Sequence, residues 1–170
     1  MKNIFKKYKP ILVITLLFII SVIVRLPTIN RPLALHYEWG MAHILITLQI
    51  WEENGISNYN FNPVYTFNNY GDKFSSNIGR LPDENKNHYY TSYPPFAFYF
   101  PFFIFKILGI YPDLLPLKIL NLILHLFTSI LIYTIISKIC NKPVYGIIFY
   151  PALISAFIYI FLPVNLWYLY

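Results

Sequence analysis

The sequence is poor in charged residues, which make up only 12% of its 170 residues. Water-soluble domains are typically about one quarter charged. Hydrophobic residues instead reach 57%, and the mean hydropathy is +0.51. This composition excludes an intrinsically disordered chain, which requires low hydrophobicity, and a basic nucleic-acid-binding domain. We therefore expect a membrane protein with no nucleic-acid partner.

Cysteine is almost absent, and acidic residues are missing from both ends of the chain. Because Cys140 is the only cysteine, an intrachain disulfide is excluded, and with it the class of small disulfide-stabilised secreted domains. All seven acids lie between Glu38 and Asp113, whereas four lysines precede the first apolar run. Basic ends around an acidic middle predict that these parts lie on opposite sides of a membrane.

Three apolar runs are candidates for membrane spans: Ile11–Val24, Leu117–Ile136 and Val144–Leu162. About 20 apolar residues cross a bilayer, so the second and third runs are long enough by themselves. The first run reaches that length with its flanking residues, Tyr8 to Leu26. A cleaved signal peptide is the alternative for the first run, but no small-residue cleavage site follows it. We expect an uncleaved anchor.

The distribution of lysine and arginine predicts the orientation of these spans. The positive-inside rule places the N-terminal lysines and the basic loop 137–143 in the cytoplasm, which predicts an integral protein of the cell membrane with a cytoplasmic N-terminus. Residues 27–116 then lie outside. Within them, Pro94–Tyr111 has an apolar core of twelve residues with three prolines, which is short for a span. We expect a short helix that dips into the outer leaflet, with a fourth span as the alternative.

These patterns predict a membrane all-α fold, namely a transmembrane helix bundle with one large extracytoplasmic loop. The expected parts are an N-terminal transmembrane anchor (1–26), a first extracytoplasmic loop (27–93), a short re-entrant or membrane helix (94–116) and a transmembrane helical pair (117–170). Because three spans bury little surface between helices, we expect the chain to be the N-terminal part of a longer membrane protein.

The outer loop begins with a predicted helix, Trp39–Asn54, which Gly55 terminates as a glycine just past the last turn. Apolar residues recur along it at a helical spacing: Met41, Ile44, Leu45, Leu48 and Trp51. This stripe predicts an amphipathic helix lying on the bilayer surface. Further on, Val64–Phe67 is consistent with a strand that a turn follows, and the segment 80–91 is consistent with a small β-hairpin whose turn is 82–87.

Glu38 directly precedes this helix and is the first acid of the chain. A carboxylate there meets the positive end of the helix dipole and stays ionised, which suits a general base or a metal ligand beside the membrane. A plain capping acid is the alternative. His36 and His43 flank Glu38, but the spacing is not that of a zinc-binding His-Glu-x-x-His sequence, so we predict that these histidines do not bind a metal.

The second predicted span has a polar side. Asn121, His125 and Thr128 are spaced by four and three residues and therefore share one side of a helix. Polar residues inside a membrane normally face a bundle interior or a cavity. Hydrogen bonding between helices and a substrate groove are the two interpretations of this side.

The order of several short segments resembles the N-terminal part of the C-type (GT-C fold) glycosyltransferases that use polyprenyl-phosphate sugars, such as the protein O-mannosyltransferases and the lipid A aminoarabinose transferases. The matching segments are Arg25-Leu26-Pro27, Arg31-Pro32-Leu33 before the acid Glu38, the helix ending at Gly55, Tyr93-Pro94-Pro95-Phe96, Lys106-Ile107-Leu108-Gly109 and Leu162-Pro163. Two positions depart from the family. Tyr37 precedes Glu38 where many members have a second acid, and Pro94 stands where the aminoarabinose branch has a phosphate-binding lysine.

The resemblance implies a membrane enzyme that transfers a sugar from a lipid-linked donor to an extracytoplasmic acceptor, with Glu38 as the catalytic acid that deprotonates or orients the acceptor. It implies no cofactor, and it leaves the need for a divalent metal open. The fragment alone is expected to be inactive, because later loops and spans of the fold are absent from it.

Groups that would hold the donor phosphate are cationic or hydroxyl side chains. Four candidates follow the resemblance: Arg31, Lys86, Tyr90 and Tyr93. Ordinary surface charges are the alternative for Arg31 and Lys86. The competing function is a non-enzymatic membrane protein, such as a transporter piece or an assembly subunit, in which Glu38 is a plain helix cap.

Overall fold

The computed structural model describes residues 2–33, 38–67, 82–140 and 149–162. All regular secondary structure in these ranges is helical, so the all-α prediction is confirmed there. The chain forms two compact units. Unit 1 comprises Met1–Arg31 and Lys118–Tyr170, and unit 2 comprises Pro32–Leu117. The predicted loop 27–93 and the segment 94–116 therefore fall almost entirely into a single unit.

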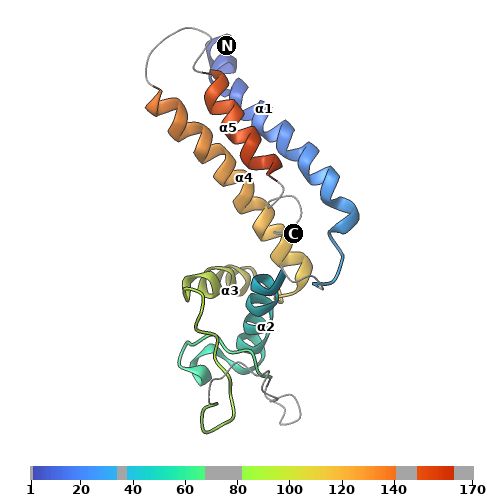
Figure 1. Ribbon diagram of the computed structural model, residues 1–170, viewed down its shortest axis with the longest axis vertical. Coiled ribbons are helices and arrows are strands. Elements are labelled where there is room, and N and C mark those ends of the chain that lie inside the picture. Colours follow the sequence, from blue (N-terminus) through green and yellow to red (C-terminus); the bar gives the residue numbers. More distant parts are fainter. Residues whose placement is uncertain (1, 34–37, 68–81, 141–148, 163–170) are drawn as a thin grey trace. The chain divides into compact units, whose positions relative to one another are not determined.

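Unit 1 contains three helices that lie side by side (Figure 1): α1 (Lys2–Arg25), most of α4 (Leu114–Ile139) and α5 (Phe149–Phe161). A short 3-10 turn, η1 (Leu26–Thr28), follows α1. The core of the unit lies between α1 and α5 and consists of Ile14, Phe18, Ala156 and Ile160. Leucines of α4, such as Leu122 and Leu126, pack against this core. The three helices therefore share one apolar seam.

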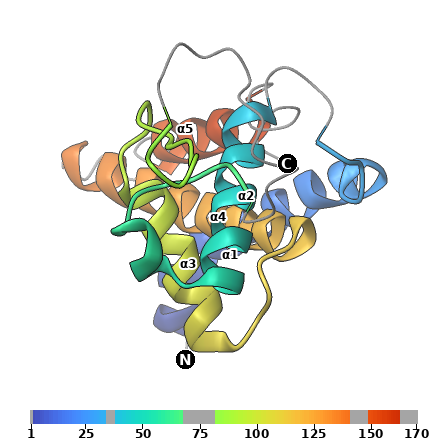
Figure 2. The ribbon, with the colours of Figure 1, turned by 90° about the horizontal axis from the view of Figure 1, so that it is seen from below.

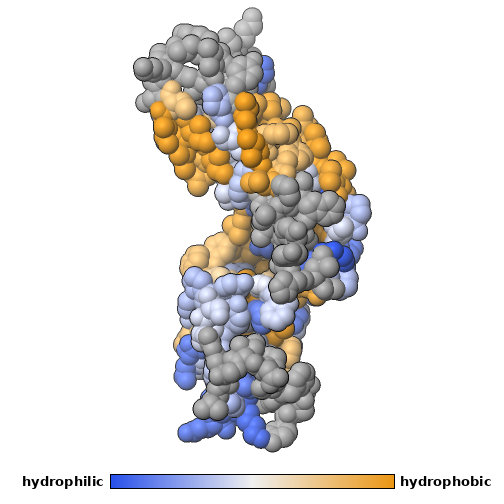
Figure 3. Space-filling view, viewed as in Figure 1, coloured by the Kyte–Doolittle hydropathy of each residue, from blue (hydrophilic) through white to orange (hydrophobic). Residues whose placement is uncertain are grey.

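Within the described residues, two helices are long and apolar enough to cross a membrane, Lys9–Thr28 and Leu114–Ile139. They correspond to the first and second predicted spans, and the second extends three residues beyond its prediction at each end. Apolar side chains cover their exposed surfaces, as the orange areas over unit 1 show (Figure 3). The third predicted span is described only as the 13-residue helix α5, because residues 144–148 lie outside the described ranges. Its crossing of the membrane stays a prediction.

The polar residues of α4 are divided between two environments. His125 is buried, and its Nδ1 lies 3.4 Å from Nη1 of the buried Arg25. Arg25 also donates through Nη2 to the carbonyl of Ile160 near the end of α5, at 3.2 Å. The Thr128 hydroxyl instead donates to Leu124 of its own helix. Contact between helices, rather than a groove, therefore accounts for the position of His125.

In its described residues, unit 2 contains the helices α2 (Trp39–Asn54) and α3 (Phe96–Leu108), which lie side by side (Figures 1 and 2). The predicted start and end of α2 are confirmed, and Gly55 follows it with a positive φ of 81°. Trp51 of α2 is buried, and its ring stacks on Tyr99 of α3 with centroids 5.6 Å apart. Part of the predicted apolar stripe therefore packs inside the protein, and an interfacial position of α2 stays a prediction.

Side chains of α2 form hydrogen bonds with the segment that follows the short 3-10 helix η3 (Ile56–Tyr59). The Thr47 hydroxyl donates to the carbonyl of Val64 at 2.8 Å, and Trp51 Nε1 donates to that of Asn62 at 3.2 Å. Because both donors are buried or partly buried, these bonds fix the segment without a regular strand.

The predicted hairpin is corrected to a single bridge. No strand occurs in the described ranges, and Val64 forms an isolated antiparallel bridge with Tyr89. The bridge is supported by bonds from the Tyr65 N–H to His88 and from the Tyr90 N–H to Pro63. The predicted partner segment 80–81 lies outside the described ranges. The alternation of residues indicated an extended conformation but could not identify its partner.

The acids in the last turn of α2 connect this helix to α3 and to the segment after it. Glu52 accepts hydrogen bonds from Lys106 Nζ at 2.9 and 3.1 Å, and Glu53 accepts one from the Tyr111 hydroxyl at 2.7 Å. Acids at a helix C-terminus oppose the helix dipole. These partners provide the compensation, although exposed pairs contribute little free energy.

Candidate functional site

Glu38 occupies the N-cap position of α2 and is only 3% exposed. Its side chain makes no capping hydrogen bond to the first turn of the helix. A plain capping role therefore does not account for this residue. Carboxylates are rarely buried unless they are paired, so the position of Glu38 requires specific surroundings.

Tyr93 lies over the first turn of α2. A Cβ atom placed on Gly40 would be 3.1 Å from the Tyr93 hydroxyl, so only glycine permits this approach without a shift of the tyrosine. Gly40 is two residues from Glu38. Tyr93 itself remains 40% exposed. The structure thus brings Tyr93 to the helix end that Glu38 begins.

Tyr90 reaches the same half of α2 through His43. Its ring stacks on the imidazole with centroids 4.4 Å apart and an interplanar angle of 29°. Tyr90 also contacts Tyr93, with ring centroids 5.1 Å apart. Trp39 and Tyr65 approach the imidazole edge to face, at 5.8 and 5.9 Å. We call the five residues His43, Trp39, Tyr65, Tyr90 and Tyr93 the aromatic cluster.

His43 is the polar centre of this cluster. Burial lowers the pKa of His43 below its usual value of 6.5, so the imidazole is neutral at neutral pH. Its Nδ1 atom is buried and has no hydrogen-bond partner among the described residues. A buried N–H donor without a partner would be costly, which favours the tautomer with the proton on Nε2. His43 can therefore act as a hydrogen-bond donor through Nε2.

Lys86 lies in the segment that precedes Tyr90. It is exposed and has a left-handed backbone conformation, with φ of 61°, in a loop organised by Asp83. The Asp83 carboxylate accepts hydrogen bonds from the N–H groups of Asn85 and Asn87 and from the Tyr89 hydroxyl, at 2.7 to 2.9 Å. The role of Lys86 in phosphate binding stays a prediction.

Arg31 belongs to unit 1, whereas the other candidate residues belong to unit 2. Its backbone carbonyl and that of Ile29 both accept hydrogen bonds from Lys118 Nζ, at 3.1 and 2.8 Å. Lys118 is fully buried, so this contact fixes the chain just after η1. The hydrogen bond from Lys118 anchors the backbone of Arg31. The role of the Arg31 guanidinium in phosphate binding stays a prediction.

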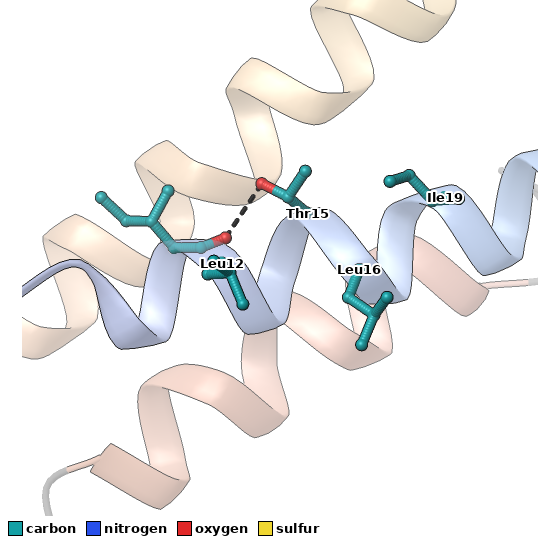
Figure 4. Close-up of a pocket in the computed structure, with 5 residues that line it drawn as sticks. Leu12, Thr15, Leu16 and Ile19 are labelled. Atoms are coloured by element: carbon teal, nitrogen blue, oxygen red, sulfur yellow. Dashed lines mark hydrogen bonds between the residues drawn. The ribbon is translucent and has the colours of Figure 1, made fainter. Parts of the chain in front are cut away.

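Metal-ligating side chains and a surface groove are two further features of the described ranges that bear on a binding site. No group of three or more histidine, cysteine, aspartate or glutamate side chains lies there in a position to hold a metal ion. A surface groove of about 400 Å³ runs along α1 and is lined by Ile11, Leu12, Thr15, Leu16 and Ile19 (Figure 4). The Thr15 hydroxyl donates to the carbonyl of Ile11, so the groove offers no group for binding polar ligands.

Sequence reasoning considered His43 only as a metal ligand and missed its aromatic contacts. The spacing of Trp39 and His43, one helical turn apart, was the available signal. The stacking of Tyr90 had no such signal, because residues 47 positions apart meet through tertiary structure alone.

Comparisons of the chain with protein-family models, with curated proteins and with solved structures each found no match.

Proposed function

We propose that this protein is a membrane glycosyltransferase, or the N-terminal portion of one, that transfers a sugar from a polyprenyl-phosphate donor to an acceptor outside the membrane. The observation that carries this proposal is the burial of Glu38 at the start of α2 without a capping hydrogen bond. A buried acid whose side chain does not cap its own helix is a candidate for catalysis. In this role Glu38 accepts the proton of the acceptor hydroxyl as the sugar is transferred.

The aromatic cluster supports this role. Tyr93 and Tyr90 provide hydroxyl groups, and neutral His43 provides an N–H donor, near the helix end that begins at Glu38. Such uncharged donors suit sugar hydroxyls and phosphate oxygens. We assign donor binding to Tyr90 and Tyr93, and we retain Arg31 and Lys86 as cationic candidates.

The proposed topology places α2, α3 and the aromatic cluster on the extracytoplasmic side. The charge asymmetry supports this orientation, because every acid of the chain falls between Glu38 and Asp113, within unit 2. A cysteine at Ser76 in a Cys140→Ser background should react with a membrane-impermeant thiol reagent in intact cells. Reaction only after permeabilisation would show that the orientation is wrong.

The catalytic role is tested with the variant Glu38→Gln, made in the full-length protein that the cell produces. Loss of a general base typically lowers the rate about 10²–10⁴-fold, whereas loss of a helix cap costs about 1 kcal/mol of stability and leaves the chemistry intact. The matched control is Glu84→Gln, which removes an exposed acid from the same unit. Transfer of labelled sugar from a polyprenyl-phosphate donor is measured for both.

Activity of purified, folded Glu38→Gln within a few-fold of the unchanged protein would overturn the catalytic assignment. Absence of any sugar transfer by the unchanged protein, across a panel of lipid-linked sugars, would favour the alternative of a non-enzymatic membrane protein. In that case Glu38 is a structural residue, and its substitution should lower thermal stability.

A further inference from the structure

α3 has two apolar faces, and only one of them is covered. Phe98, Phe102 and Phe105 are at most 5% exposed and form the inner face, which packs in unit 2. On the opposite side, Phe96, Phe103 and Ile107 are 70, 48 and 82% exposed. These three residues are spaced by seven and four positions and therefore form one stripe. We call them the outer face of α3.

We propose that the outer face of α3 contacts the acyl chains of the membrane, and that α3 lies in the plane of the membrane interface. The continuity of the chain supports this occupant. Only residues 109–113 separate the end of α3 from α4, which is long and apolar enough to cross a membrane. The outer face is therefore close along the chain to a membrane-length helix.

The connecting residues have the composition of a membrane boundary. Ile110 and Tyr111 are 41 and 50% exposed, and the Tyr111 hydroxyl donates to Glu53. Tyrosines are enriched where an apolar ring can enter lipid while its hydroxyl remains in the polar region.

The flank of α3 excludes a helix surrounded by hydrocarbon. Lys106 lies on this flank and pairs with Glu52 of α2, with side chains that are 57 and 29% exposed. Charged groups are costly in the hydrocarbon core, so this side remains in the polar region. With 13 residues, α3 is about 20 Å long, which is short of the roughly 30 Å hydrocarbon core. An interfacial helix satisfies both conditions, whereas a spanning helix does not.

The test uses single cysteines labelled with an environment-sensitive fluorophore in the full chain, in a Cys140→Ser background, reconstituted in phosphatidylcholine vesicles. Labels at positions 96, 103 and 107 report the outer face, a label at Lys106 reports the flank, and a label at Glu84 is the exposed control. Lipids that carry a nitroxide at a shallow or a deep acyl position serve as quenchers.

We expect the shallow nitroxide to quench the three outer-face labels several-fold more strongly than the label at position 84, and to a similar extent at 96 and 107. Unequal depths at these two ends would show an inserted helix and overturn the in-plane orientation. If the labels are shielded from water but are quenched by neither the shallow nor the deep nitroxide lipid, then protein covers the outer face and the proposal is wrong. Labels exposed to water would overturn the proposal directly. None of these readouts depends on sugar transfer.

Discussion

The imidazole of His43 lies nearly flat against the ring of Tyr90, with centroids 4.4 Å apart. This contact joins the first half of α2 to the segment that pairs with Val64. Stacked aromatic pairs contribute about 0.5–1.5 kcal/mol beyond the burial of their area. The contact therefore fixes the position of Tyr90 relative to the helix that Glu38 begins.

Replacement of Tyr90 should separate the packing role of its ring from the role of its hydroxyl. We expect Tyr90→Ala to destabilise unit 2 by about 2–3 kcal/mol, because a half-buried ring and its stacking are lost. Tyr90→Phe retains the ring and its stacking, so it should lower the unfolding temperature less than Tyr90→Ala does. Thermal unfolding in detergent measures both. Equal destabilisation by the two variants would show that the hydroxyl, rather than the stacking, is the stabilising group.

His43 should make stability depend on pH. Burial lowers its folded-state pKa below 6.5, so the unfolded chain binds the proton first as the pH falls. The stability associated with neutral His43 is thus complete above about pH 6.5 and decreases below it, by less than about 1.4 kcal/mol per pH unit. His43→Phe should remove this component. Identical pH profiles for the two proteins between about pH 7.5 and 5.5 would contradict the prediction.

Asp83 should control the order of the loop that contains Lys86. Burial raises the pKa of the Asp83 carboxyl, but hydrogen bonds from Tyr89, Asn87 and Asn85 outweigh it, and the net pKa is lowered. Burial and the bond to Asp83 also raise the pKa of the Tyr89 phenol to about 12. We expect Asp83→Asn to cost about 1–3 kcal/mol and to accelerate proteolysis of the loop.

The control for Asp83→Asn is Glu84→Gln, which changes the charge equally at an exposed neighbouring position. It should leave the rate of proteolysis unchanged. Equal acceleration by both variants would mean that charge, and not the hydrogen bonds of Asp83, determines the order of the loop.

Lys118 should be essential for the stability of unit 1. Its Nζ donates to the carbonyls of Ile29 and Arg31, and the residue is fully buried. Lys118→Met retains the apolar stem but leaves both carbonyls without this donor, which costs about 1–3 kcal/mol for each. Lys138→Met, at the exposed opposite end of α4, is the matched control. Similar unfolding temperatures for the two variants would refute the anchoring role of Lys118.

The helices were predictable because their signals are local. Gly55 marked the end of α2, and the apolar run 117–136 marked most of α4. The pairing of Val64 with Tyr89 was not predictable, since residues 25 positions apart meet only when α2 and α3 have packed. Glu52 and Glu53 lie in the last turn of α2, where acids oppose the helix dipole. Their partners Lys106 and Tyr111 become apparent only in three dimensions.

The candidate site was predictable in part. The position of Glu38 at the start of a helix followed from the sequence, but its burial depends on the packing of distant segments. Tyr90 and Tyr93 were selected for their hydroxyl groups, and the structure adds that α2 holds both through His43 and Gly40. The sequence contains no local signal for these two contacts, because they depend on how side chains from distant segments fit together in the folded chain.

The close approach of Tyr93 to Gly40 has an evolutionary consequence. Alanine at position 40 would favour the helix by up to about 1 kcal/mol, but its methyl group would be 3.1 Å from the tyrosine hydroxyl. Tyr93 would have to shift by a few tenths of an ångström to admit this methyl group. Related chains should therefore show covariation between positions 40 and 93, with a displaced or shorter side chain at 93 where alanine is at 40.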